Sequence, residues 1–143
     1  MALTFHVISN RDAGGRFARV TRRQRRRLRG VARESGRRLA RDWARGTRSR
    51  RIRRSIAIRM HPSQPRVTVS TEVPFARFEE EDTRAHIITP RKKKVLRFEA
   101  GGEMVFARVV RHPGTRGSHA LRRAARRERP RHRSAIQRVM EGG

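Results

Sequence analysis

Four consecutive acidic residues form the part of this sequence whose residue types could best serve a metal ion or acid-base chemistry. Glu79, Glu80, Glu81 and Asp82 could supply oxygen ligands to a cation, or a general acid and a general base. Consecutive side chains point in different directions, however, whereas both kinds of site need groups that converge. We therefore interpret the run as a solvated turn.

Histidine and glycine motifs indicate no other catalytic chemistry. No HExxH sequence or other paired metal spacing occurs, and the Asp12-Ala13-Gly14-Gly15 stretch fits a turn rather than a phosphate-binding loop. The chain has no Cys, which excludes thiol catalysis and Cys-based zinc sites. The sequence therefore predicts a protein that is not an enzyme and that holds no metal or cofactor. The histidines considered are His6, His61, His86, His112, His119 and His132.

Net charge is the strongest feature of the composition. The 143 residues fit one domain, taken as residues 1–143, with a formal net charge of +27. Residues 63–110 are nearly neutral, so the excess lies in the two flanking segments and is almost entirely arginine. Such a field attracts polyanions: nucleic acid, an anionic membrane or an acidic protein face. Tyr is absent, which leaves few side chains for stacking on single-stranded bases.

Apolar periodicity predicts the elements of the N-terminal half. Leu3, Phe5 and Val7 alternate as in a strand, and the segment 10–15 then ends it. Residues 16–45 predict a long amphipathic helix with arginine outside its apolar stripe, ended near Gly46. The stripe comprises Phe17, Val20, Leu28, Val31, Ala32, Leu39 and Trp43.

A Pro-bounded hairpin and a helical turn are predicted next. Apolar residues from Ile52 to Met60 indicate a strand that stops at Pro62, and residues 67–73 alternate again. Pro74 then begins a helical turn that places Phe75 and Phe78 on one side.

The segment 86–110 predicts a second hairpin. Residues 86–88 form a short extended piece, and the Gly101-Gly102 pair between apolar alternations is typical of a two-residue hairpin loop. This loop places Phe98 opposite Val105 and Leu96 opposite Ala107 on one face. The other face is half apolar, with Val95, Met104, Phe106 and Val110, as in a sheet that meets a helix or a neighbouring subunit.

A basic helix from about Ser118 completes the chain. Pro130 is predicted to break or kink it. We expect residues from about 1 to 15 and from 130 to 143 to be flexible, or to become ordered only on assembly. The fold class is therefore α+β: a long N-terminal amphipathic helix packed on a mostly antiparallel sheet with hairpins, and a C-terminal helix.

The order of motifs from Ser49 onward resembles the head-tail joining (neck, minor tail or tail completion) family of long-tailed double-stranded DNA bacteriophages. The segment 49–56, SRRIRRSI, stands where members carry Thr-Gly-Arg-Leu-Arg-Arg-Ser-Ile after a long helix. The segment 75–86, FARFEEEDTRAH, is similar to their aromatic-Ala pair followed by Glu-x-Gly-Thr-Arg-Pro-His. The Gly-Gly hairpin, the Arg111 to Thr115 segment RHPGT and Leu121-Arg122 complete a likeness over residues 30–125.

The resemblance implies a structural virion protein rather than a catalyst. Members form an oligomeric ring, expected to be six- or twelve-fold, between the portal of the capsid and the tail. The expected partners are other copies of this chain, portal or connector proteins, the tail terminator or tail tube, and packaged double-stranded DNA. The implied location is the neck of the virion, after assembly in the host cytoplasm.

Candidate contact residues follow from both lines of argument. We expect the subunit interface at Glu79, Glu80, Glu81, Asp82, Val95, Met104, Phe106 and Val110, and polyanion contacts at Arg22, Arg23, Arg26, Arg37, Lys92, Lys93 and Lys94. The alternative is a free-standing RNA- or DNA-binding protein of the ribosomal or nucleoid kind. No basic leader or apolar run of membrane-spanning length occurs, so we expect a soluble, unprocessed chain without membrane contact.

Overall fold

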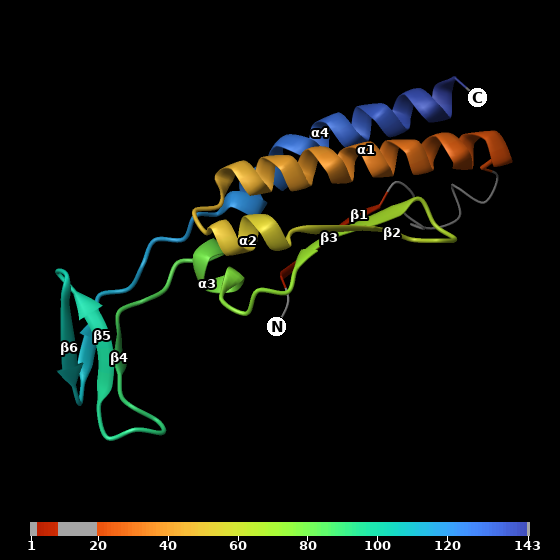
Figure 1. The fold of residues 1–143 in the computed structure, drawn as a ribbon. Helices are drawn as coiled ribbons and strands as arrows, with labels where there is room; N and C mark the ends of the chain where they lie inside the picture. The colour runs from red at the N-terminus through yellow and green to blue at the C-terminus, as the bar shows by residue number, and fades with distance from the viewer. Residues whose placement is uncertain (1–2, 9–19, 143) are drawn as a thin grey trace. The chain divides into compact units, whose positions relative to one another are not determined.

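The computed structural model describes residues 3–8 and 20–142, which form two compact units (Figure 1). Unit 1 comprises the described residues up to Glu81 together with residues 118–142, and unit 2 comprises residues 82–117. Unit 2 is thus inserted between two parts of unit 1 in the sequence. The predicted α+β class is confirmed, and the expectation of one domain stays a prediction.

Unit 1 contains a three-stranded antiparallel sheet with the strand order β1-β3-β2. β1 spans Leu3–Ile8, β2 spans Ala57–Met60 and β3 spans Arg66–Thr71. In the central strand, Val67, Val69 and Thr71 are buried and alternate with half-exposed residues. Because successive strand residues face opposite sides, one face of the sheet is apolar and requires a cover. The predicted hairpin between β2 and β3 is confirmed.

Two long helices supply that cover and lie side by side (Figure 1). α1 spans Arg22–Gly46, and α4 spans Ala120–Glu141. Thr21 and Gln24 form a capping box at the start of α1, which explains why the helix begins six residues after the predicted Arg16. Residues 16–19 lie outside the described part of the chain. The core between helices and sheet includes Val7, Leu39, Trp43, Ile52, Val67, Val69, Leu121 and Ala124.

One prediction for the elements of unit 1 is wrong. Ile52 lies in the short helix α2, Arg50–Ser55, and not in a strand; Ser49 caps this helix and Ile52 is its one buried residue. Pro130 lies inside α4 without ending it, so of the predicted break or kink the break does not occur and the kink stays a prediction. The second short helix, α3, spans Ala76–Glu80 and confirms the predicted turn after Pro74.

Unit 2 consists of two two-stranded antiparallel sheets. β4 (His86–Ile88) pairs with β7 (Val110–His112), and β5 (Leu96–Ala100) pairs with β6 (Glu103–Ala107). The register places Phe98 opposite Val105, as predicted. Both loop glycines have positive φ, 63° and 86°, which two-residue hairpin loops of this type require.

Unit 2 is closed where the chain enters and leaves it. Thr83 and Thr115 form an isolated antiparallel bridge, with N–H to carbonyl distances of 2.9 and 3.1 Å in the two directions. Gly114 beside it has φ of 91°, and an added Cβ there would collide with the carbonyl of Thr83. Gly114 is therefore needed for this closure, because only glycine fits the space and takes up this conformation readily.

Candidate functional site

The acidic run does not form a carboxylate site, because its first member caps a neighbouring helix. Glu79 accepts hydrogen bonds from the backbone N–H groups of Arg48 (2.7 Å) and Ser49 (3.0 Å), and from the hydroxyl of Thr47. These groups form the connection between α1 and α2. A carboxylate at this position satisfies backbone donors that the short helix α2 leaves open.

Glu80 does the same for α4. Its carboxylate, 8% exposed, accepts from the backbone N–H groups of Leu121 (2.9 Å) and Arg122 (2.8 Å). His119 precedes α4 in a left-handed conformation with φ of 48° and provides no side-chain cap. Glu80, which lies in α3, therefore accepts the hydrogen bonds that a capping side chain at the start of α4 would otherwise accept. The interpretation of Glu79 and Glu80 as a solvated turn is wrong.

The other two acids are exposed but also bonded within their own chain. Glu81 forms an ion pair with Arg77 at 2.9 Å, and Asp82 accepts from the backbone N–H of Gly117 at 2.8 Å. The four carboxylates thus diverge onto separate partners. Among residues 3–8 and 20–142, no group of three or more candidate ligands could hold a metal ion.

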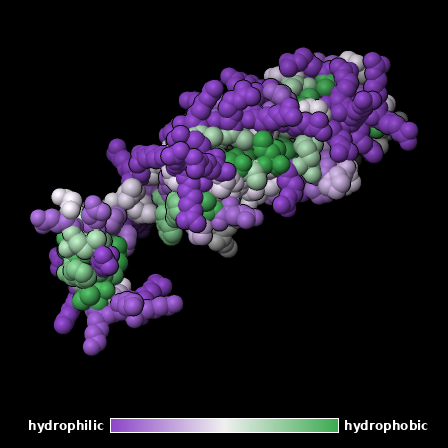
Figure 2. Space-filling model, viewed as in Figure 1, coloured by the Kyte–Doolittle hydropathy of each residue, from purple (hydrophilic) through white to green (hydrophobic). Residues whose placement is uncertain are grey.

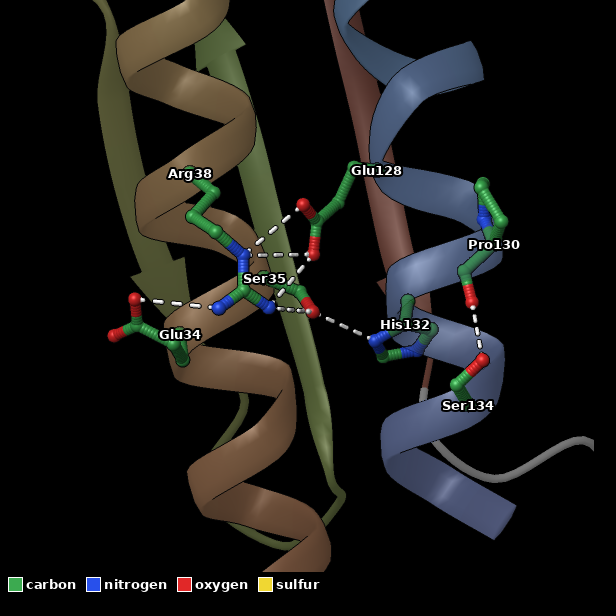
Figure 3. A network of polar contacts seen from close by, with 7 residues as sticks. All are labelled: Glu34, Ser35, Arg38, Glu128, Pro130, His132 and Ser134. Carbon is green, nitrogen blue, oxygen red and sulfur yellow. Dashed lines mark hydrogen bonds and ion pairs between the residues drawn. The ribbon is translucent and has the colours of Figure 1, made fainter. Parts of the chain in front are cut away.

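A polar network between α1 and α4 was not predicted (Figure 3). Glu128, 4% exposed, accepts hydrogen bonds of 2.9 to 3.2 Å from Arg38, and buried Ser35 contacts the Nδ1 atom of His132 at 2.8 Å. The bonds to Glu128 raise the pKa of Arg38, against the opposing effect of burial. Arg38 also reaches Glu34, one turn earlier on α1, at 3.5 Å. The sequence sign of this network is Glu128, the one acidic residue among the arginines of residues 120–140.

This network fixes how the two helices pair. The hydroxyl of Ser35 is fully buried between them, where it contacts Nδ1 of His132 and accepts a hydrogen bond from Arg38. Breaking a buried ion pair is costly whereas forming one gains little, so such pairs favour one packing arrangement over others. We assign it to the fold.

The basic side chains predicted to face a polyanion are exposed. Arg22, Arg23, Arg26 and Arg37 lie on the surface of α1, and residues 92–94 lie in the exposed segment before β5. A groove of about 610 Å³ brings two of these together with arginines that sequence reasoning did not select. The described residues that line it are Arg22, Arg25, Arg26, Arg29, Gly30 and Arg33. Arg37 does not line this groove.

The outer face of the β5-β6 hairpin is half apolar and exposed, with Phe106 opposite Arg97 and Met104 opposite Glu99. Phe106 is 62% exposed, Met104 49% and Val95, directly before β5, 38%; Figure 2 shows hydrophobic residues on the surface of unit 2. Val110 is half-buried and pairs with Ile88 in the other sheet, so its assignment to this face is wrong. The structure therefore brings together three of the four apolar residues predicted for an interface.

His86 and His112 are cross-strand neighbours with ring centroids 5.0 Å apart. Nδ1 of His86 donates to the carbonyl of Arg84 at 2.8 Å, and Nδ1 of His112 accepts from the N–H of Gly114 at 3.0 Å. Both rings thus stabilise turns in unit 2, where two ligands alone do not make a metal site.

The groove and the apolar hairpin face are the two candidate functional surfaces. Within the described residues, no helix combines the length and apolar character that crossing a bilayer would require. Comparison with known proteins found no match to this chain among family models, curated proteins or solved structures.

Proposed function

We propose that this chain is a structural subunit of the head-tail joining ring of a long-tailed double-stranded DNA bacteriophage. Its function would be assembly and sealing between capsid and tail, not chemistry. The neighbours in such a ring are further copies of this chain, with portal or connector proteins on one side and tail proteins on the other. The proposal rests on the motif order described above and on one structural observation.

That observation is the exposed apolar face of the β5-β6 hairpin. A chain of net charge +27 has little difficulty staying in solution, yet it presents Phe106 and Met104 on an otherwise polar hairpin. A two-stranded hairpin is marginally stable alone, and covering its outer face would stabilise it. Ring closure requires one patch to contact a different patch on the next copy, and the exposed face of this hairpin could supply one of the two patches.

The motifs of the resemblance also have definable structural roles. In the segment 49–56, Ser49 caps α2 and Ile52 reaches the core; in the segment 75–86, Glu79 and Glu80 cap α2 and α4. Gly114 allows the closure at Thr83. These roles explain why such residues recur in that order, and they support the resemblance without depending on function.

Self-association in high salt tests this proposal. We expect the purified chain in 1 M NaCl to sediment as a closed oligomer with ring-shaped particles in negative stain, because salt screens charge but strengthens apolar contact. Phe106→Glu should yield monomers. Phe78→Glu is the matched control, because Phe78 is 64% exposed but lies in α3 of unit 1. A folded monomer under all conditions would contradict the proposal.

The arginine groove supports the second candidate, a free-standing nucleic-acid-binding protein. Such a protein would remain monomeric and bind with a steep dependence on salt. It would need no apolar face on unit 2, so Phe106→Glu would leave its nucleic-acid affinity unchanged. The two candidates thus differ in the same sedimentation experiment.

A further inference from the structure

The groove on α1 is a concentrated positive surface. Five of its six described lining residues are arginines, each with another arginine three or four positions away, and the sixth is Gly30. The guanidinium of Arg29 donates to the carbonyl of Pro62 at 2.9 Å. Among the described residues, no hydrogen bond or ion pair joins the guanidinium groups of Arg22, Arg25, Arg26 or Arg33 to a partner.

This arrangement is unfavourable for the chain on its own. Like charges three and four positions apart destabilise a helix, and the N-terminal end of a helix already carries partial positive charge. α1 has no acidic residue in its first turn to offset either effect. An anion in the groove would relieve both, so charge complementarity identifies the chemistry of the occupant.

Gly30 provides an independent observation. Glycine in a helix interior is less favourable than alanine, and at Gly30 an added Cβ would find no described atom within 4 Å. The fold therefore does not require glycine at position 30, since a side chain there would meet no described atom. Gly36, by contrast, lies against Val67. Gly30 therefore leaves open space beside the arginines, which permits the close approach of an extended ligand.

We infer that this groove binds the phosphodiester backbone of double-stranded DNA. From Arg22 to Arg33 the helix rises about 16 Å, a length along which one DNA strand presents more than one phosphate. The five arginines of the groove are therefore within reach of consecutive phosphates, and each is suited to bidentate phosphate contact. An acidic protein partner would be expected to bring apolar anchors, and the described lining offers them no apolar counterpart.

The inference rests on the proposed function only in naming the duplex as the genome that passes the ring. Contacts of this kind read no base sequence. The groove would hold the backbone of DNA during packaging and retention without selecting a site on it.

Fluorescence anisotropy with a random 30-base-pair duplex tests the groove between 50 and 300 mM salt. The groove variant is Arg22→Gln, Arg26→Gln and Arg33→Gln; the control, with the same change in net charge, is Arg41→Gln, Arg45→Gln and Arg127→Gln, all exposed. We expect the slope of log K against log salt to fall by about 3 in the groove variant and by less than about 1 in the control. Equal losses would overturn the inference.

Gly30→Leu separates binding from folding. Leucine is a good helix former, so this variant should raise the midpoint of thermal unfolding by a few degrees while weakening duplex binding about tenfold or more. Polyglutamate serves as the acidic-polypeptide probe; if Gly30→Leu and the groove variant weaken its binding as much as that of DNA, the groove is a general anion surface and the inference fails. Sedimentation of the same variants in 1 M NaCl reports ring formation separately, so either proposal can fail alone.

Discussion

At the scale of single residues, the acidic run shows how one local geometry serves several helices. Side chains at successive positions of α3 diverge, and this divergence is what lets Glu79 reach the start of α2 while Glu80 reaches the start of α4. Four consecutive positions are enough to predict that the carboxylates do not converge. They are not enough to predict the partners of Glu80, because Leu121 and Arg122 lie about forty positions further along the chain.

Glu80→Ala should destabilise unit 1 by about 2 kcal/mol, because two backbone N–H groups at the start of α4 would lose their acceptor in a buried position. Urea denaturation followed by circular dichroism measures this change. Glu81→Ala is the control, since its ion pair with Arg77 is exposed and should contribute less than about 0.5 kcal/mol. Equal effects at the two positions would show that Glu80 is not the cap.

Gly36→Ala should cost about 1 to 3 kcal/mol of stability through overpacking. An ideal Cβ at Gly36 would lie 2.6 Å from a methyl carbon of Val67, which is fully buried and cannot move aside. The same denaturation experiment checks this, with Gly30→Ala as a control that should gain up to about 1 kcal/mol. Unchanged stability of Gly36→Ala would mean that α1 and β3 approach less closely.

At the scale of elements, apolar periodicity and turn residues were sufficient to predict a helix or strand wherever neighbouring residues alone determine it. The β5-β6 register follows from Gly101 and Gly102, which take up the positive φ that the loop requires. Ile52 was assigned to a strand because Ile56, Ile58 and Met60 follow it at even spacings. It lies in a helix instead, because Ser49 caps a helix that begins at Arg50. The groove was missed in part, since arginine occurs on every exposed face of α1.

The α1-α4 pairing predicts a non-additive pair of substitutions. Arg38→Met alone should destabilise the chain by about 3 kcal/mol, because Glu128 would keep a buried, uncompensated charge. Arg38→Met combined with Glu128→Leu should recover most of that loss. The four denaturation midpoints of this cycle give the coupling; additive effects would mean that Glu128 is solvated.

At the scale of the whole molecule, the two units divide the two candidate surfaces between them. The arginine groove lies on unit 1 and the apolar hairpin face on unit 2. The nearly neutral segment 63–110 does not coincide with unit 2, because unit 2 is closed by a backbone bridge between Thr83 and Thr115 that has no apolar or charge pattern in the sequence.

Excising unit 2 tests this division. Replacing residues 84–114 by Asn-Gly joins Thr83 to Thr115 through a two-residue hairpin loop, which their antiparallel bridge already suits. We expect unit 1 to remain helical, to unfold cooperatively and to bind duplex DNA, but to be monomeric in 1 M NaCl. Circular dichroism, anisotropy and sedimentation measure the three properties. Loss of cooperative unfolding would show that unit 1 requires unit 2.

The position of α4 in the chain has a consequence for synthesis on the ribosome. The core of unit 1 needs Ala120, Leu121 and Ala124, which are translated after unit 2. The hairpins of unit 2 have only local partners and can form while α1 and its sheet still lack half of their cover. The nascent chain therefore exposes the apolar residues of an unfinished core until α4 emerges, so unit 2 is synthesised before unit 1 can complete its core.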